Sequence, residues 1–303
     1  MSQVAISMAS VQRDYGSVSG HSHCSQLAPG APSPGLKRST DAVLNPDAVE
    51  RAANLLMQAR LNHDTLDGLP DACRPTNLQE AYAVQDKLIE LLGWPLAGWF
   101  CACTNKTIQT LLGLDEPYYA RLLKDFVLES PATLEASKFP PIVLECEFGF
   151  RLAHDLPSRE QTWSREEVEA AIASVHPTIE VVAGHLMDWP NQDVFSVIAD
   201  NGTDGALIVG PGESDWRALD LVSMEVSLEV DGQVVREGTG NRVLGDPVSA
   251  LVWLANARSR DGDGLKAGHV HNTGTATDIY WMQPGEHAAA DFCELGTVAM
   301  TLR

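Results

Sequence analysis

The run PPIVLECEFGF at residues 140–150 limits what this chain can fold into more than any other stretch. Side chains of a β-strand alternate between its two faces. One face of this strand is therefore apolar and consists of Leu144, Cys146, Phe148 and Phe150. The other face carries Glu145, Glu147, Gly149 and Arg151. Such a strand needs a hydrophobic core on one side and a place for two carboxylates, roughly 7 Å apart along the strand, on the other.

Two interpretations of the glutamate pair are open at this point. One face of an antiparallel strand is often exposed to solvent, and glutamate is common on such a face. Glutamate is nevertheless depleted in strands, and like charges at this spacing repel unless a positive group lies between them. The pair alone favours a solvated face over a metal or catalytic site, and a third carboxylate would change that balance.

Composition excludes several classes of partner. With 303 residues, of which 44% are hydrophobic, the chain can form one sizeable core, or a main domain with a smaller one. Its formal net charge of −20 argues against nucleic acid and anionic membranes, which both require basic surface. We expect no transmembrane helix, because no run of 18 apolar residues exists, and the N-terminus lacks the features of a signal peptide. Six scattered cysteines without a C-x-x-C pair indicate reduced thiols and a cytoplasmic location.

The chain divides by composition into three parts. Residues 1–44 are rich in Ser, Gly, Pro and Ala and are predicted to be a disordered tail. Residues 45–125 read as a helical region, with helices that begin at the Asn45-Pro46 cap and at a Thr76–Gln79 capping box, and a short third helix at 104–112. Residues 126–303 read as a strand-rich catalytic domain, so the expected fold class is α+β.

Seven strands are predicted in that third part. An Asp231-Gly232 turn between alternating runs predicts a hairpin. Two helices are expected to interrupt the strands, one after Ser164, with Glu167 completing a capping box, and one after Asp246. The predicted strands are 142–153, 177–184, 205–210, 223–230, 233–238, 269–275 and 290–302.

A third carboxylate lies in the strand predicted around residues 178–183. Glu180 is its only charged residue, and its neighbours are apolar. A lone acid in a buried strand is costly unless it is paired or binds a cation. Three carboxylates from two strands would form a hard-oxygen site suited to Mg²⁺ or Mn²⁺. His176 and His185 lie on either side of Glu180 and are expected to be surface or core residues.

The order of motifs along the chain resembles a known family. The motifs are E-x-E-F-x-F-x-L, H-P-x-I-E-V-V, A-D-N-G, G-A-L-I-V-G, V-L-G-D-P and T-G-T. Together they resemble the fumarylacetoacetate hydrolase superfamily and, within it, the 2-oxopent-4-enoate hydratases and 4-oxalocrotonate decarboxylases of aromatic catabolism. The resemblance covers about residues 46–303. It implies a mixed β-roll or distorted barrel with a small helical N-terminal region, and a homo-oligomer.

The resemblance also implies roles for individual residues. Glu145, Glu147 and Glu180 fall on the family's metal ligands, for which Mg²⁺ or Mn²⁺ is expected. A 2-oxo acid substrate would chelate this metal, which would stabilise the enolate formed as a proton moves. The implied substrate-binding residues are Thr273, Thr275 and Asn201, and Asp200 matches an acidic residue near the family's active site.

The chain departs from the family where the family places its acid and base. Phe100 stands at the position of a lysine assigned to proton transfer, and Tyr118 stands at an acidic position. A phenylalanine cannot carry a proton, and a tyrosine with an ordinary pKa near 10 is a poor base at neutral pH. Lys106, Asp115 and Tyr118, together with Asp200, therefore remain as candidate catalytic residues.

Three functions are compatible with this pattern. The first is a metal-dependent, hydratase-like lyase that acts on a 2-oxo dienoic acid, with an altered proton relay. The second is a C–C hydrolase, decarboxylase or tautomerase that acts on a related 2-oxo acid or acylpyruvate with the same scaffold. The third is a catalytically silent paralogue that binds a 2-oxo acid or supports a partner enzyme. The retained glutamates argue against the silent paralogue, because a site that has lost its function is not expected to retain buried like charges.

Overall fold

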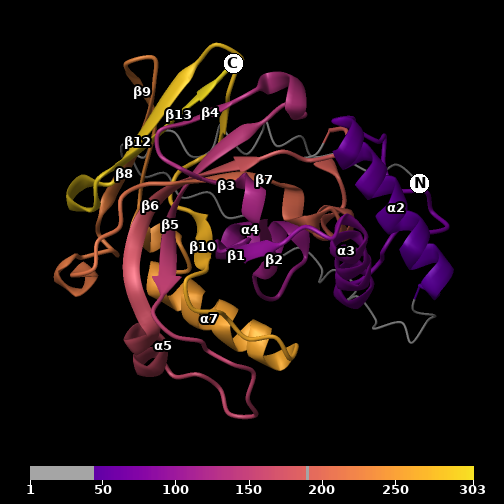
Figure 1. Cartoon of the computed structure of the whole chain (residues 1–303), viewed down its shortest axis with the longest axis horizontal. Helices are drawn as coiled ribbons and strands as arrows, with labels where there is room; N and C mark the ends of the chain where they lie inside the picture. Colours follow the sequence, from indigo (N-terminus) through magenta and orange to yellow (C-terminus); the bar gives the residue numbers. More distant parts are fainter. Residues whose placement is uncertain (1–43, 189–190) are drawn as a thin grey trace, which may run out of the picture.

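The computed structural model describes residues 44–188 and 191–303. Its first elements are two helices, α2 (Pro46–Asn62) and α3 (Leu78–Leu92), which lie side by side at one edge of the molecule (Figure 1). The predicted start of α2 is confirmed, because the Asn45 side chain accepts a hydrogen bond from the Ala48 amide, with Pro46 in the first turn. The predicted disordered tail lies, apart from Leu44, outside the described residues.

The cap of α3 differs from the prediction. The N-cap is Asn77, whose side chain accepts from the Glu80 amide at 3.0 Å. The Glu80 carboxylate in turn accepts from the amide and the hydroxyl of Thr76, at 2.7 and 2.9 Å. The predicted box of Thr76 and Gln79 is wrong by one residue, because the asparagine that follows the threonine takes the cap.

A curled mixed sheet forms the centre of the fold (Figure 1). Among the described residues it contains eight strands. Seven run in the order β2-β1-β10-β5-β6-β7-β3, and β11 pairs with β5. The pairs β1·β10 and β3·β7 are parallel and the others antiparallel. The bounds are β1 (Leu96–Ala102), β2 (Tyr118–Leu123), β3 (Val127–Glu129), β5 (Val143–Leu152), β6 (Ile172–Val182), β7 (Asp204–Val209), β10 (Val270–Thr275) and β11 (Tyr280–Trp281).

A smaller sheet lies beside the first, with the order β4-β13-β12-β8-β9. The predicted hairpin is confirmed, because Asp231 and Gly232 both have positive φ between two paired strands. The single strand predicted for 290–302 is wrong. The chain turns at Cys293–Leu295 and at Gly296, whose φ is +101°. The bounds are β4 (Ala132–Leu134), β8 (Glu225–Val230), β9 (Gln233–Thr239), β12 (His287–Asp291) and β13 (Thr297–Leu302).

Four further α-helices, and several short 3-10 helices, lie in the described part of the chain. The predicted capping box of Ser164 and Glu167 is confirmed at the start of α5. Helix α6 was not expected from the sequence, and neither were β1 and β2, which come from the region predicted as helical, 45–125, and join the central sheet. The bounds are α4 (Lys106–Leu112), α5 (Arg165–Ala171), α6 (Val194–Ala199) and α7 (Pro247–Arg260). Within the described part of the chain, no helix has the length and apolar character needed to cross a membrane.

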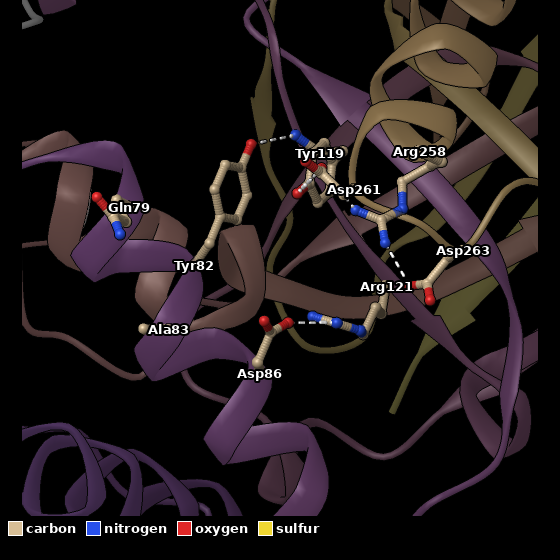
Figure 2. Close-up of a pocket in the computed structure, with 9 residues that line it drawn as sticks. All are labelled: Gln79, Tyr82, Ala83, Asp86, Tyr119, Arg121, Arg258, Asp261 and Asp263. Atoms are coloured by element: carbon tan, nitrogen blue, oxygen red, sulfur yellow. Dashed lines mark hydrogen bonds and ion pairs between the residues drawn. The ribbon is translucent and has the colours of Figure 1, made fainter. Parts of the chain in front are cut away.

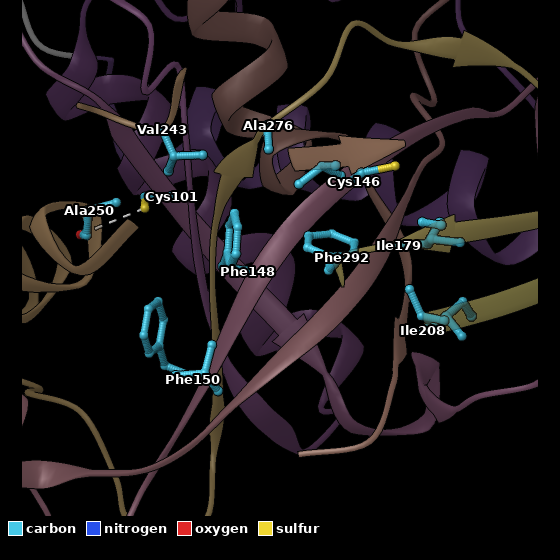
Figure 3. Close-up of a cluster of buried hydrophobic side chains, with 14 of the residues drawn as sticks. Cys101, Cys146, Phe148, Phe150, Ile179, Ile208, Val243, Ala250, Ala276 and Phe292 are labelled. Atoms are coloured by element: carbon cyan, nitrogen blue, oxygen red, sulfur yellow. Dashed lines mark hydrogen bonds between the residues drawn. The ribbon is translucent and has the colours of Figure 1, made fainter. Parts of the chain in front are cut away.

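The main core lies against the apolar face of β5, as the alternation predicts. Phe148 and Phe150 are fully buried in it (Figure 3). Phe148 meets Phe292 edge to face, with 5.2 Å between the ring centroids. Because this face of β5 is filled by apolar side chains, the glutamates on the alternate face point to the other side of the sheet. The expected mixed, curled α+β fold is confirmed.

Candidate metal and substrate site

The three glutamates share one face of the central sheet. Glu145 on β5 lies directly opposite Glu180 on β6, and Glu147 lies opposite Thr178. Side chains with this register and a spacing of two residues lie next to one another. Glu147 is 1% exposed and Glu180 4%, while Glu145 is partly exposed. The structure thus places the three acids that were predicted as metal ligands on one face of the sheet.

Neighbouring polar groups hold two of these carboxylates in place. The Gly274 amide donates to Glu147 Oε2 at 2.6 Å, and Asn272 Nδ2 donates to Glu180 Oε2 at 3.1 Å. The Thr178 hydroxyl lies 2.8 Å from Asn272 Oδ1 and 2.9 Å from the Glu147 carbonyl oxygen. The sequence analysis missed these supporting residues. The one available signal was a polar asparagine within the strand predicted at 269–275.

Burial and mutual repulsion make the ionised form of this cluster costly. Burial raises the pKa of Glu145 to about 7, although a hydrogen bond from the Glu147 carboxyl opposes the rise. Burial also raises the pKa of Glu147 and of Glu180 well above the ordinary value. Negative charge on Glu145 and Glu180 raises the pKa of Glu147 further, and negative charge on Glu145 has the same effect on Glu180. A divalent cation would remove this penalty.

The donor chemistry fits Mg²⁺ or Mn²⁺, which prefer carboxylate oxygens. Over residues 44–188 and 191–303, no three acidic, histidine or cysteine side chains converge on one cation position. In the arrangement seen here, Glu147 and Glu180 instead accept hydrogen bonds from Gly274 and Asn272. Cation binding would therefore require the carboxylates to turn toward one point from the shared face on which they already lie.

Two aromatic residues lie beside the acids, on the face of the central sheet that carries the glutamates (the inner face). The rings of Phe100 and Tyr118 both pack against Gly202, where an added Cβ would lie 3.0 and 3.2 Å from them. Burial raises the pKa of Tyr118 well above 10, and nearby Cys103, Glu145 and Glu180 raise it further. Tyr118 therefore stays protonated at neutral pH and can donate a hydrogen bond near the glutamates, whereas it cannot act as a base.

Two predicted catalytic residues lie on the surface. Lys106 and Asp115 are both exposed. Lys106 Nζ donates to Gln109 Oε1 at 3.2 Å and to the Asp115 main-chain oxygen at 3.3 Å. The structure thus brings Lys106 and Asp115 together, but not with the glutamates.

Asp200 and Asn201 are fully buried and have partners within the protein. Asp200 Oδ2 accepts from the His185 amide at 2.7 Å, and its Oδ1 lies 3.9 Å from an Arg60 nitrogen. Asn201 Nδ2 donates to the Arg121 carbonyl oxygen at 2.9 Å, and its Oδ1 accepts from the Arg121 amide at 3.0 Å. These contacts join α2, the loop before α6 and strand β2.

The two threonines predicted to bind substrate are placed differently. Thr273 is fully buried, and its hydroxyl donates to the Phe148 carbonyl oxygen at 2.9 Å. Thr275 lies opposite Glu147 in the register and is only partly buried. Its hydroxyl donates to the Thr277 carbonyl oxygen at 3.0 Å. Of the two, Thr275 is the one with both exposure and a position beside the acids.

A large cleft of about 720 Å³ lies away from the glutamates, between α3 and the end of α7 (Figure 2). Tyr82 and Tyr119 stack in it, with 4.3 Å between their ring centroids. Its two arginines already have acidic partners within the lining: Arg121 pairs with Asp86, and Arg258 pairs with Asp261 and Asp263. None of the three glutamates lines this cleft.

Comparison with known proteins settles the family. Residues 118–303 match the family model described as fumarylacetoacetate (FAA) hydrolase C-terminal, which is more than half of the chain. The chain belongs to the fumarylacetoacetate hydrolase family. The family match begins at β2 and includes the strands that carry all three glutamates.

Named relatives extend this result over most of the described residues. The chain is 31% identical over 246 residues to a 2-keto-4-pentenoate hydratase of Paraburkholderia xenovorans (strain LB400), covering 80% of this chain and 90% of that one. It is 29% identical to a 2-hydroxyhexa-2,4-dienoate hydratase of Comamonas testosteroni, covering 76% and 88%. A solved 4-oxalocrotonate decarboxylase from Pseudomonas putida G7, complexed with magnesium and adipate, matches with a TM-score of 0.80 and 26% identity, covering 87% of this chain and all of that one. These relatives are hydratases and a decarboxylase, and this member of their family is likewise an enzyme.

Proposed function

We propose that this enzyme is a divalent-metal-dependent, hydratase-like lyase that acts on a 2-oxo dienoic acid. The observation that carries the proposal is the group of three glutamates on one face of the sheet, two of them buried, with Glu145 directly opposite Glu180. The hydratase relatives support the reaction class. The magnesium in the related decarboxylase structure supports a divalent cation, for which Mg²⁺ and Mn²⁺ are both candidates.

In this proposal Glu145, Glu147 and Glu180 hold the cation. When bound, the cation acts as a Lewis acid toward the carboxylate and 2-oxo oxygens of the substrate. The Gly274 amide and the Asn272 side chain each hold Oε2 of one carboxylate, so we assign the other oxygen, Oε1 of Glu147 and of Glu180, to the cation. Their role is to fix the carboxylates so that the substrate meets an ordered site.

We assign to Tyr118 the role of a hydrogen-bond donor to the substrate. It lies close enough to Glu145 and Glu180 for their charges to raise its pKa, and it stays protonated. We infer that its hydroxyl donates a hydrogen bond to substrate oxygen as negative charge develops there. Thr275, partly exposed and opposite Glu147, is proposed to contact the substrate carboxylate. Lys106 and Asp115 are less suited to proton transfer, because both lie at the surface.

Decarboxylation is the second candidate reaction, and the similarity to the 4-oxalocrotonate decarboxylase structure favours it. Decarboxylation and C–C hydrolysis of 2-oxo acids both require stabilisation of an enolate, so one scaffold can serve either. The third possibility, a silent paralogue, is opposed by the three glutamates, since buried like charges without a ligand only destabilise a protein.

An ultraviolet assay tests the proposal. Freshly generated 2-hydroxypenta-2,4-dienoate is mixed with enzyme and Mg²⁺ or Mn²⁺, loss of the dienol is followed, and the product is identified. We expect metal-dependent formation of 4-hydroxy-2-oxopentanoate, and its loss in Glu147→Gln. This variant keeps the side-chain shape and removes a buried charge, so its inactivity would not reflect unfolding. No turnover by a protein that demonstrably binds metal would refute hydration and direct the assay to oxaloacetate and acylpyruvates.

The proposal also includes the cellular location of the enzyme and its oligomeric state. A cytoplasmic location is supported by the described cysteines, which are all free. A homo-oligomer is inferred from the family alone, and light scattering coupled to size-exclusion chromatography would test it.

A further inference from the structure

Strand β10 departs from regular pairing beside the glutamates. Its register with β5 shifts between Asn272 and Thr275, the residue opposite Glu147. Within this irregular stretch Gly274 has a φ of +95°, in the left-handed region that favours glycine. The Gly274 amide donates to Glu147 Oε2 at 2.6 Å. The position of this carboxylate oxygen therefore depends on what holds Gly274 in its unusual conformation.

The side chain of Thr104 packs against Gly274. Strand β10 lies between β1 and β5, and Phe100 of β1 pairs in parallel with Asn272, so the segment that follows β1 passes Gly274. An added Cβ on Gly274 would lie 2.2 Å from Thr104 Oγ1 and 3.0 Å from Thr104 Cγ2. Gly274 is thus in contact with a side chain that follows β1 and with a carboxylate of β5.

Thr104 is itself buried and held in place by its main chain. The Leu244 amide, from the segment that leads into α7, donates to the Thr104 carbonyl oxygen at 2.9 Å. The buried Gln109 side chain donates from Nε2 to the Cys103 carbonyl oxygen at 2.7 Å. Thr104 also lines a cavity of about 410 Å³. A smaller residue at this position would leave space into which Gly274 can move, because no packed group lies in the cavity to replace the contact.

We propose that Thr104 is a positioning residue for the metal site, which holds Gly274 so that its amide fixes Oε2 of Glu147 and leaves Oε1 for the cation. The inference rests on the proposed function, because it assumes that Glu147 is a metal ligand. Groups that orient a metal ligand through a hydrogen bond contribute about 10- to 100-fold to metal affinity. Thr104 acts one contact further from the cation, so its loss should weaken cation binding by about tenfold.

Binding of Mn²⁺ to the full chain, without substrate, tests the inference. The dissociation constant is measured by electron paramagnetic resonance, which detects the free ion. Thr104→Ala should raise the dissociation constant by about tenfold, because Gly274 and the Glu147 carboxylate are then free to move. Thr104→Ser keeps Oγ1, the atom closest to Gly274, and should bind Mn²⁺ as tightly as the wild type.

Thr104→Val is a second variant, which keeps the proposal testable if the alanine variant does not fold. It preserves the shape of the side chain but places a methyl group where Oγ1 contacts Gly274. A methyl group needs more room than a hydroxyl oxygen, so Gly274 is displaced and Mn²⁺ binding should weaken by a similar factor.

Thr301→Ala is the matched control, because Thr301 is a partly buried threonine of β13 in the smaller sheet, and its loss should leave Mn²⁺ affinity unchanged. Thermal unfolding of each metal-free protein shows whether a variant has lost its fold. A purely structural role would lower the unfolding temperature of the Thr104→Ala and Thr104→Val proteins without weakening Mn²⁺ binding, and this result would overturn the inference. Equally weak binding by Thr104→Ser and Thr104→Ala would overturn it as well.

Glu147→Gln, measured in the same way, separates the inference from the proposed function. If this variant binds Mn²⁺ as the wild type does, or if the wild type binds none, the proposed metal site is refuted and the role of Thr104 with it. If Glu147→Gln loses the ion while the alanine and valine variants of Thr104 retain full affinity, the metal site stands and only the role of Thr104 is refuted.

Discussion

Two buried clusters of acids lie close together in this molecule, and they are neutralised differently. Asp200 and Asp204 are at most 2% exposed, and Arg60 from α2 lies 3.9 and 3.6 Å from their carboxylates. The cluster of Glu145, Glu147 and Glu180 makes no ion pair with a lysine or arginine among the described residues. Negative charge on Asp204 even raises the pKa of Glu180.

The difference indicates what each cluster is for. Where buried acids join helices to the sheet, the chain itself supplies the cation, Arg60. Where three acids share the inner face of the sheet, the described residues supply none, so the compensating charge has to come from a ligand or from protons. Unpaired buried charges are costly, and a protein that keeps them in this arrangement gains function and not stability from them.

Loss of Arg60 should produce the largest change in stability. Arg60→Met removes the guanidinium from two buried aspartates and leaves only the His185 ring, 3.3 Å from Asp200, beside them, and we expect the free energy of unfolding to fall by about 3–5 kcal/mol. Urea denaturation at neutral pH would measure this. The control is Arg260→Met, which removes an exposed pair with Glu116 and should cost less than about 1 kcal/mol. Similar losses in the two variants would show that Arg60 has no special role.

Glu147→Gln should stabilise the metal-free protein. The folded-state pKa of Glu147 is raised, so its contribution to stability is present below the unfolded pKa near 4.5 and is lost as the pH rises through the folded pKa. We therefore expect a gain of about 1–4 kcal/mol at pH 8 that disappears at pH 4. Chemical denaturation in the presence of a chelator, at both pH values, provides the measurement.

The matched control for that experiment is Glu229→Gln, an exposed glutamate of β8, which should change stability by less than about 0.5 kcal/mol at either pH. A Glu147→Gln variant that is less stable than the wild type at pH 8 would contradict the cost assigned to the acid cluster.

The pH dependence of stability that arises from Asp204 tests how completely Arg60 compensates the charge of this buried carboxylate. Burial raises the pKa of Asp204 to about 6, although Arg60 acts in the opposite direction. Wild-type stability should therefore decline as the pH rises from about 4 to 6, by at most about 3 kcal/mol from this residue. Asp204→Asn should lack that part of the decline, which unfolding curves at several pH values would reveal. An unchanged pH profile would mean that Arg60 compensates Asp204 fully.

Tyr118→Phe should give the smallest effect. The variant keeps the packing against Gly202 and removes the hydroxyl beside Glu145 and Glu180. We expect kcat with the dienol substrate to fall by about tenfold, with thermal stability nearly unchanged, because one hydrogen bond to the substrate is lost. An unchanged kcat would exclude Tyr118 from the reaction.

Local patterns explain which parts of this fold were predictable. The alternation in 140–150 predicted both faces of β5, because strand periodicity is a local property. Strands β1 and β2 were missed because short, nearly continuous apolar runs between helices do not distinguish a buried strand from other buried segments. The strand predicted for 290–302 was split in the structure, since the chain leaves the extended conformation between Asp291 and Thr297, where Cys293 and Gly296 both have positive φ.

The site was predictable only in part, for a related reason. The glutamates could be placed on a shared face from the alternation and the family resemblance. The hydrogen bonds from Gly274 and Asn272 depend on how β10 pairs with β5, and that register includes an irregularity between Asn272 and Thr275. A tertiary register of this kind leaves no local signal in the sequence.

The central claim is that the acids on the inner face form a cation site, and its most direct test is a Mg²⁺ titration of stability. The free energy of unfolding is measured at pH 8 for the wild type and Glu147→Gln while the Mg²⁺ concentration is raised at constant ionic strength. A ligand that binds the folded state stabilises it in proportion to the logarithm of its concentration above the dissociation constant. We predict that Mg²⁺ stabilises the wild type and leaves Glu147→Gln nearly unchanged, so that the wild type overtakes the variant. Equal responses of the two proteins, or no response in the wild type to Mg²⁺ or Mn²⁺, would contradict the claim.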